Sequence, residues 1–186
     1  MGILVFDGAE ELDFVGPFEV FGMAAKLQPG TFNVFTVGVD RKEVKAFNGL
    51  RINAEHKIDE CPTIDILVIP GGRGARREMS NPRVLKFLNR AYRSSELITS
   101  VCTGALILAS AGLLDGRKAT THWGAIGELR KFKKVTVEHR KYVKQGKIIT
   151  SAGVSSGINM ALYVVGLLYG PQLKTQTAKE IEFKIG

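Results

Sequence analysis

Short, uninterrupted apolar runs alternate along this chain with longer segments in which apolar positions recur at helical spacing. The apolar runs are rich in Ile, Leu and Val and cover 2–6, 32–39, 64–70 and 96–101. The helical patterns cover 11–27, 81–93 and 103–114. A strand covered on both faces reads as a continuous apolar run, because neither of its faces meets water. The alternation therefore predicts an α/β fold around a mostly parallel central sheet.

Two stretches depart from this alternation. In 44–54, the pair Asn48-Gly49 stands between strand-like arms and is typical of a two-residue hairpin, and 135–153 reads as two strands joined around Gln145-Gly146. We expect both to be antiparallel additions to the sheet. A last helix is predicted from about Ser156 to Tyr169, followed by a short tail.

The 186 residues, 45% of them hydrophobic, suffice for one core, so we expect a single domain over 1–186. No apolar run reaches the roughly 18 to 20 residues that a membrane span needs. Met1 leads directly into an apolar run without a charged leader, which predicts a cytoplasmic protein. The two cysteines indicate reduced thiols, and no Cys/His spacing predicts a metal site.

The net charge of +8 raises the question of a nucleic-acid partner. The basic residues are scattered, however, and only "RKFKK" at 130–134 forms a cluster. This distribution favours a solvated basic face over a polyanion site, so no nucleic-acid partner is expected. Neither GxGxxG nor GxxxxGK[ST] occurs, which argues against a nucleotide enzyme, and no cofactor is predicted.

Cys102 stands where a predicted strand meets a predicted helix. Functional crevices of α/β sheets lie at the carboxyl ends of strands, where helix N–H groups and a partial positive charge face a ligand. We expect the pKa of this thiol to be lowered there, and its backbone to have a positive φ in a tight turn eased by Gly104, a nucleophile elbow. The alternative is a small buried apolar residue, and Cys61 has no comparable setting.

Asp13 follows the first predicted strand and has apolar neighbours, among them Leu12 and Phe14. Burial among them would raise its carboxyl pKa towards neutrality, so that it could exchange a proton with a thiol or a substrate. These apolar neighbours also predict a small hydrophobic substrate substituent. The alternative is an ordinary carboxylate at a helix start. Three further carboxylates are rival candidates, namely Glu10, Glu11 and Glu19.

Two more features point to the same sheet edge. The glycines of "PGGRGARRE" at 70–78 permit close backbone approach, so Gly71 or Gly72 can offer an N–H group to a bound anion. His122 in "ATTHWG" ends a short strand and can face the crevice, with Trp123 as a packing residue or a substrate wall. A lone histidine is more often structural, so both interpretations of His122 stay open.

Four motifs resemble a known superfamily along nearly the whole chain: "LDFVGPFEV", "IPGGRG", "TSVCTGALILASAGLLDGRKATTHW" and "TSAGVSSGINMAL". They are similar to the ThiJ/PfpI superfamily of class I glutamine amidotransferase-like proteins, especially isonitrile (isocyanide) hydratases and the amidase-like domains of AraC-type regulators. The resemblance implies a flavodoxin-like three-layer α/β/α sandwich acting as a homodimer on a small molecule.

For the site, the resemblance implies Cys102 as the elbow nucleophile, Asp13 as its partnering acid and Thr103 as the third member of a hydratase-like trio. It also implies that Gly72 and the backbone of Thr103 supply anion-stabilising N–H groups. His122 matches a histidine found near the cysteine in several members.

The chain also departs from the superfamily. Thr103 stands where peptidase-like and deglycase-like members often have histidine, Asn159 stands where hydratases commonly have aspartate, and 36–54 matches little. The missing histidine disfavours peptidase activity. From the resemblance and the pairing of Cys102 with Asp13, we expect hydration of an isocyanide to a formamide. Two alternatives remain: glyoxalase-like, deglycase-like or oxidative-stress chemistry at Cys102, and a non-enzymatic ligand sensor.

Overall fold

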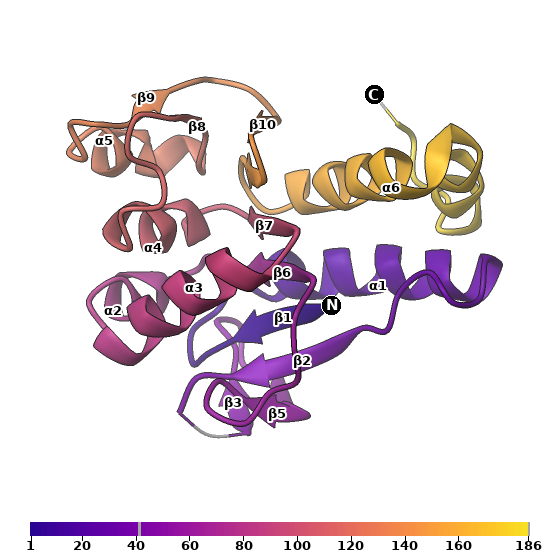
Figure 1. The fold of residues 1–186 in the computed structure, drawn as a ribbon, viewed down its shortest axis with the longest axis horizontal. Coiled ribbons are helices and arrows are strands. Elements are labelled where there is room, and N and C mark those ends of the chain that lie inside the picture. The colour runs from indigo at the N-terminus through magenta and orange to yellow at the C-terminus, as the bar shows by residue number, and fades with distance from the viewer. Residues whose placement is uncertain (41, 186) are drawn as a thin grey trace.

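The computed structural model of the protein describes residues 1–40 and 42–185. Its central sheet has the strand order β10-β11-β7-β6-β1-β2-β5 (Figure 1). These strands are β1 (Gly2–Val5), β2 (Phe35–Gly38), β5 (His56–Lys57), β6 (Ile66–Ile69), β7 (Leu97–Ser100), β10 (Tyr142–Gln145) and β11 (Ile148–Ser151). All neighbouring pairs are parallel except β10–β11 at one edge. The predicted mostly parallel sheet is confirmed.

The inner five strands run in the order β2-β1-β6-β7-β11, which is the doubly wound order of flavodoxin-like folds. The order reverses direction between β1 and β6, and ligands bind such sheets outside the carboxyl ends of the strands at this point. The flavodoxin-like three-layer class is therefore confirmed, and the topology itself marks where a site belongs.

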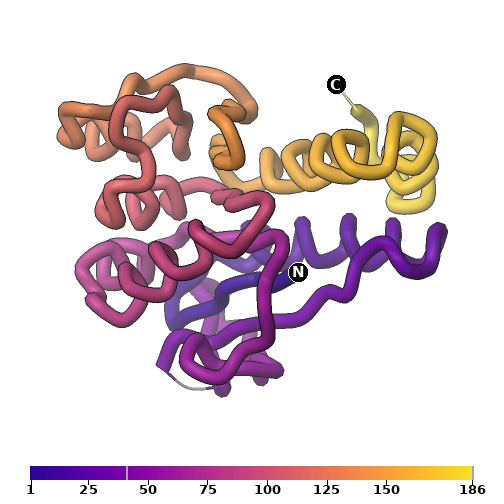
Figure 2. Tube along the Cα trace, in the orientation of Figure 1, coloured from indigo at the N-terminus to yellow at the C-terminus, as the bar shows by residue number. Residues whose placement is uncertain are grey.

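Helices pack in two groups that flank the sheet. They are α1 (Glu11–Leu27), α2 (Ala75–Glu78), α3 (Pro82–Ser94), α4 (Gly104–Ser110), the 3-10 helix η1 (Trp123–Ala125), α5 (Ile126–Leu129) and α6 (Ser156–Glu180). α1 packs against α6, although they come from opposite ends of the chain (Figure 2), and α4 packs against α2 and α3. The four residues of β1, and likewise of β6 and β7, are all buried, as continuous apolar runs predict.

The start of α3 shows how local sequence sets an element boundary. Asn81 caps the helix by accepting a hydrogen bond from the Arg83 N–H at 3.1 Å, and Pro82 occupies the first turn, where no N–H is needed. Buried Val84, Leu88 and Ala91 then recur at helical spacing on the face toward the core.

The predicted hairpin at 44–54 forms, but not as an addition to the central sheet. β3 (Glu43–Lys45) and β4 (Arg51–Asn53) make a separate two-stranded antiparallel sheet. Its turn docks on the start of α1 instead, because Asn48 donates to both carboxylate oxygens of Glu11, at 2.7 and 2.8 Å. The second excursion does join the sheet as β10 and β11, while β8 (Lys118–Ala119) and β9 (Thr136–Val137) pair separately.

The prediction that only a short tail follows Tyr169 is wrong. Gly170 has φ 89° and kinks the chain, and Pro171 then opens a further helical segment that continues α6 to Glu180. Pro favours the first turn of a helix, so the pair reads as the end of one helix and the start of another. Within the described residues, no helix is long and apolar enough to cross a membrane.

Candidate active site

Three strand ends at the switch point bring the predicted site residues together. α1, which follows β1, supplies Asp13; Gly71 and Gly72 follow β6; and Cys102 follows β7. The Gly71 N–H donates to Asp13 Oδ2 at 2.9 Å across 58 positions of sequence. A Cβ on Gly71 would lie 2.6 Å from Thr103 Oγ1 and 3.0 Å from Asp13 Oδ2, so this glycine lets both side chains approach one backbone atom.

Cys102 forms the predicted elbow, with a φ of 54° that non-glycine residues rarely adopt. Two contacts hold this strained turn. The Cys102 N–H donates to the Ala152 carbonyl at 2.8 Å, and Thr121 Oγ1 donates to the Cys102 carbonyl at 2.8 Å. A Cβ on Gly104 would lie 2.3 Å from the Ile69 carbonyl oxygen, so α4 can start this close to β6 only with glycine there.

Asp13 is fully buried. Burial raises the pKa of its carboxyl to about 7, against smaller lowering contributions from the Gly71 N–H and the Cys102 thiol. Oδ2 accepts the Gly71 bond, whereas Oδ1 has no hydrogen-bond partner among the described residues. The carboxyl is therefore poised to hold or release a proton near neutral pH, beside the thiol.

The thiol does not have the lowered pKa that its place at a helix start predicts. Burial, and then the negative charge of Asp13, raise the pKa of Cys102 to about 11. Hydrogen bonds from the backbone N–H groups of Thr103 and Val154 oppose this effect without reversing it. α4 has only seven residues, and Cys102 is 6% exposed, so desolvation outweighs the helix end.

The glycine loop also differs from the expected arrangement. The Gly72 N–H, which the resemblance assigns to an anion, donates to Thr103 Oγ1 at 2.9 Å, and Thr103 Oγ1 donates to the Gly72 carbonyl at 3.1 Å. The Gly71 N–H is bound to Asp13. Both loop donors are thus engaged within the protein, and the N–H groups that face the sulfur are those of Thr103 and Val154.

His122 lies beside the thiol loop and is half-buried. Its Nδ1 accepts from the Gly124 N–H at 3.1 Å, and its ring packs against Gly153, where a Cβ would lie 2.5 Å from Cδ2. Burial and the charge of Glu11 raise the pKa of Glu10, and a smaller electrostatic interaction with His122 lowers it. His122 therefore supports this turn through its ring, and it also lines a cavity, within electrostatic range of Glu10.

A cavity of about 480 Å³ lies next to the turn that holds Cys102, although Cys102 itself is not among its lining residues. Its lining comes from three segments, at 121–126, 139–141 and 152–156. Three lining residues contact Cys102 directly: Thr121 and Ala152 through the bonds given above, and Val154 through its N–H. Val154 itself has φ 36°. The sequence motifs contained Thr121, Ala152 and Val154, but nothing in a single sequence distinguished them from their neighbours.

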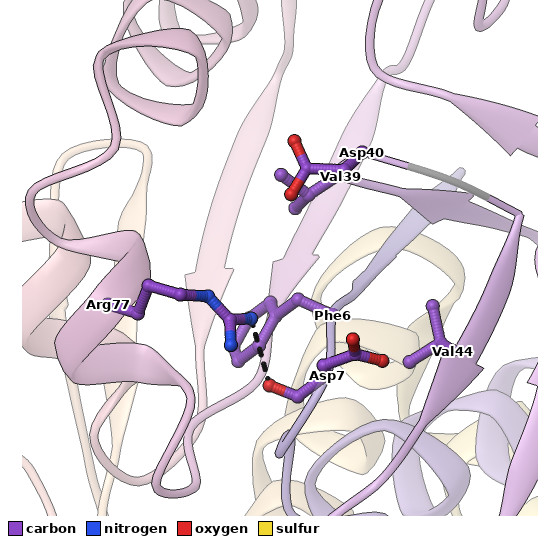
Figure 3. Close-up of a pocket in the computed structure, with 6 residues that line it drawn as sticks. All are labelled: Phe6, Asp7, Val39, Asp40, Val44 and Arg77. Atoms are coloured by element: carbon purple, nitrogen blue, oxygen red, sulfur yellow. Dashed lines mark hydrogen bonds between the residues drawn. The ribbon is translucent and has the colours of Figure 1, made fainter.

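A second cavity, of about 290 Å³, lies at the carboxyl ends of β1 and β2 (Figure 3). It is lined by Phe6, Asp7, Val39, Asp40, Val44 and Arg77. Arg77 reaches from α2 and donates to the Asp7 carbonyl at 3.0 Å, while its Nε donates to buried Glu78 at 2.7 Å. These bonds tie α2 to the end of β1. Neither cysteine lines this second cavity, and none of its lining residues makes a contact with Cys102 like those of Thr121, Ala152 and Val154.

The chain resembles several known proteins. It is 31% identical to the isonitrile hydratase of Pseudomonas putida over 183 residues, covering 98% of this chain and 78% of that protein. It is 28% identical to the HTH-type transcriptional regulator CdhR of Pseudomonas aeruginosa, covering 95% of this chain but only 53% of the regulator. A crystal structure of a ThiJ/PfpI family protein from Pseudomonas syringae superposes with a TM-score of 0.91 at 30% identity, covering 99% of this chain and 74% of that one.

Residues 1–167 match the family model described as "DJ-1/PfpI family". This match takes in β1, the Asp13 helix, the glycine loop, the cysteine elbow and about the first half of α6. Together with the flavodoxin-like strand order, it confirms the resemblance inferred from the sequence motifs. The chain belongs to the DJ-1/PfpI family.

Proposed function

We propose that the protein is a cysteine-dependent enzyme that adds water to a small electrophile, and that the reaction is hydration of an isonitrile to an N-substituted formamide. One observation supports this above the others. A fully buried carboxyl, Asp13, with a pKa raised to about 7, lies beside the thiol of Cys102 at the switch point of the sheet. Such a pair can move a proton to and from a reacting carbon.

The raised thiol pKa defines what Asp13 must do. With a pKa of about 11, Cys102 holds its proton at neutral pH, so it needs a base as it attacks. Asp13 is partly ionised near its pKa of about 7 and can take that proton. The resulting neutral carboxyl no longer repels the thiolate, and the N–H groups of Thr103 and Val154 stabilise the charge on sulfur.

In the first half of the reaction, Sγ of Cys102 forms a bond to the terminal carbon of R–N≡C. The proton that left the thiol passes through Asp13 to the same carbon, which gives the thioimidate R–N=CH–S–Cys102. The thiol has then added across the isonitrile carbon, with no oxidant or reductant involved. Asp13 ends this half as a carboxylate.

In the second half, water attacks the thioimidate carbon while Asp13 accepts one of its protons and returns it to nitrogen. The tetrahedral product R–NH–CH(OH)–S–Cys102 then expels the sulfur and yields R–NH–CHO. The hydroxyl proton restores the thiol. The sequence identity of 31% to the Pseudomonas putida isonitrile hydratase, over nearly the whole chain, supports this choice of substrate.

The same pair of side chains could instead add the thiol to the carbonyl of an α-oxoaldehyde, the chemistry of a glyoxalase or deglycase. A ligand-sensing role is the third candidate, since the chain matches about half of CdhR. Neither alternative explains why a carboxyl with a pKa near 7 is buried beside the thiol as directly as hydration does.

The test is a substrate panel of a simple alkyl isonitrile, methylglyoxal and a peptide, run in water enriched in oxygen-18. Hydration predicts a formamide with one labelled oxygen, formed by the wild type and by Cys61→Ala but not by Cys102→Ala. Turnover of methylglyoxal alone would favour the glyoxalase-like reaction. Absence of turnover with all three, together with tight ligand binding, would favour a sensor.

We further propose that the protein works as a cytoplasmic homodimer. The two free cysteines support a reducing compartment, and related proteins supply the dimer by analogy. Size-exclusion chromatography with light scattering at micromolar concentration should give twice the monomer mass of 20.3 kDa.

A further inference from the structure

The cavity beside Cys102 differs from the small apolar wall that the neighbours of Asp13 predict. Its volume of about 480 Å³ falls within the range of pockets that hold ligands of many heavy atoms. Its lining comes from 121–126, 139–141 and 152–156, and none of it from the segment around Asp13. A substrate that reacts at Cys102 can therefore extend a long substituent away from α1.

Two cations, Arg140 and Lys141, line this cavity. Its lining includes His139, Arg140 and Lys141, and it contains no carboxylate among the described residues. Arg140 contacts Glu138 at 3.4 Å, but Lys118 contacts the same carboxylate at 3.0 Å, so one negative charge is shared by two cations. Lys141 forms no ion pair with any residue that the structure describes.

The acidic groups of the site lie at its other end. Asp13 is next to the thiol, and Glu10 lies within electrostatic range of both Asp13 and His122. An anionic substituent would be repelled at that end and attracted at 139–141. The charge distribution thus orients a substrate with its reactive carbon at Cys102 and any negative group at the loop between β9 and β10.

Trp123 also lines the cavity. Its side chain is 82% exposed, unusual for so large an apolar residue, and its ring lies beside that of His122 with centroids 5.3 Å apart. An exposed indole in a cavity offers a flat surface to an aromatic or other apolar group.

We propose that this cavity binds the substituent of the substrate, and that the substituent is an apolar, preferably aromatic, group ending in a carboxylate held by Arg140 and Lys141. The assignment of a reactive carbon to Cys102 rests on the proposed function, whereas the binding of the carboxylate does not. Arg140 and Lys141 then determine specificity without touching the reacting atoms.

The test uses 4-formamidobenzoate and its methyl ester, which share a ring and a formamide and differ in charge. Trp123 is the only tryptophan in the chain, so its fluorescence reports occupancy of this cavity without any turnover. We expect the acid to bind about tenfold more tightly than the ester. The difference should shrink as ionic strength rises from about 0.05 M to about 0.5 M, because salt screens exposed charges.

Single substitutions test whether Arg140 and Lys141 bind the carboxylate. Arg140→Gln and Lys141→Gln should each weaken binding of the acid by about threefold to tenfold and leave the ester within about twofold. Lys86→Gln is the matched control, because Lys86 is exposed on α3 and lines a different cavity. It should change neither affinity.

Equal affinity for acid and ester would overturn the proposal, as would a preference for the acid that survives both cavity variants or is lost equally in Lys86→Gln. An unchanged Trp123 signal on saturating either ligand, with binding seen by calorimetry, would also overturn it. Isonitrile turnover without a preference for the acid would support the proposed function and overturn the carboxylate site. A preference for the acid without isonitrile turnover would support the carboxylate site and overturn the proposed function.

Discussion

Cys102 and Cys61 have the same side chain in two very different regions. Cys102 follows β7 at the carboxyl edge of the sheet, whereas Cys61 lies in the connection that enters β6 from the opposite edge. Burial raises the pKa of both thiols. Cys61 donates to the Ile58 carbonyl at 3.7 Å, a weak hydrogen bond that any small polar side chain could make.

The two cysteines differ in the carboxylate that lies near each thiol. Asp59, near Cys61, has a side chain that is 68% exposed and pairs with Arg83. Asp13, near Cys102, is fully buried and has a pKa raised to about 7. The comparison teaches that a low thiol pKa does not distinguish Cys102, the nucleophile that we propose, from Cys61. A buried partner that can exchange its proton does.

The largest expected effect comes from removing one thiol and not the other. Cys102→Ala should lower turnover by at least roughly 10⁴-fold, and Cys102→Ser should be nearly as inactive, because a hydroxyl is a far weaker nucleophile. Mass spectrometry during turnover should find an adduct on Cys102 and none on Cys61. Turnover that survives Cys102→Ala would refute the mechanism.

Asp13→Asn keeps the shape of the side chain and its bond from the Gly71 N–H but removes the exchangeable proton. We expect kcat to fall by roughly 10²- to 10⁴-fold, with smaller losses for Asp13→Glu where it fits. Circular dichroism should show an unchanged fold. A loss below about tenfold would reduce Asp13 to a supporting residue and direct attention to Glu10.

The pH dependence of kcat/KM should reflect the two pKa values of Asp13 and Cys102. The reactive form holds one proton shared by Asp13 and Cys102, so it predominates between their pKa values of about 7 and about 11. Activity should therefore rise with pH through about 7 and lie roughly 100-fold lower at pH 5 than on the plateau. In the Asp13→Asn variant, this rise of kcat/KM near pH 7 should be absent. A plateau that extends unchanged to pH 5 would contradict this assignment.

Alkylation by iodoacetamide compares the two thiols in one molecule, because Cys61 serves as the internal standard. The charge of Asp13 is the second cause of the raised Cys102 pKa, so Asp13→Asn should lower that pKa. At pH 9 we expect Cys102 to react about tenfold faster in this variant, while turnover falls. Peptide mass spectrometry gives both rates. Slower alkylation would show that Asp13 does not repel the thiolate.

The smallest effect is expected at Cys61. Cys61→Ala should leave kcat/KM within about twofold of the wild type and lower the free energy of unfolding by about 1 kcal/mol, the cost of a partly buried contact. Urea denaturation measures the second quantity. A large activity loss in a folded Cys61→Ala variant would remove the distinction between the two cysteines.

Much of the fold was readable from local pattern. The apolar runs at 2–6, 64–70 and 96–101 became β1, β6 and β7, because strands buried on both faces must be apolar throughout. The positive φ of Cys102 was also predictable, since a strand that turns at once into a helix needs it. The helix beyond Gly170 was missed because a Gly-Pro pair reads as an end, although it can equally begin a new helix.

The sequence by itself determined the class of fold and the order in which strand ends present Asp13, the glycine loop and Cys102. Only the tertiary structure decided the protonation of the thiol, since its pKa of about 11 depends on burial and on a carboxyl 89 positions away in the chain. It also decided that the Gly72 N–H binds Thr103 and that 139–141 reaches the cavity. Desolvation and charge act through space, and no local pattern records which distant groups meet.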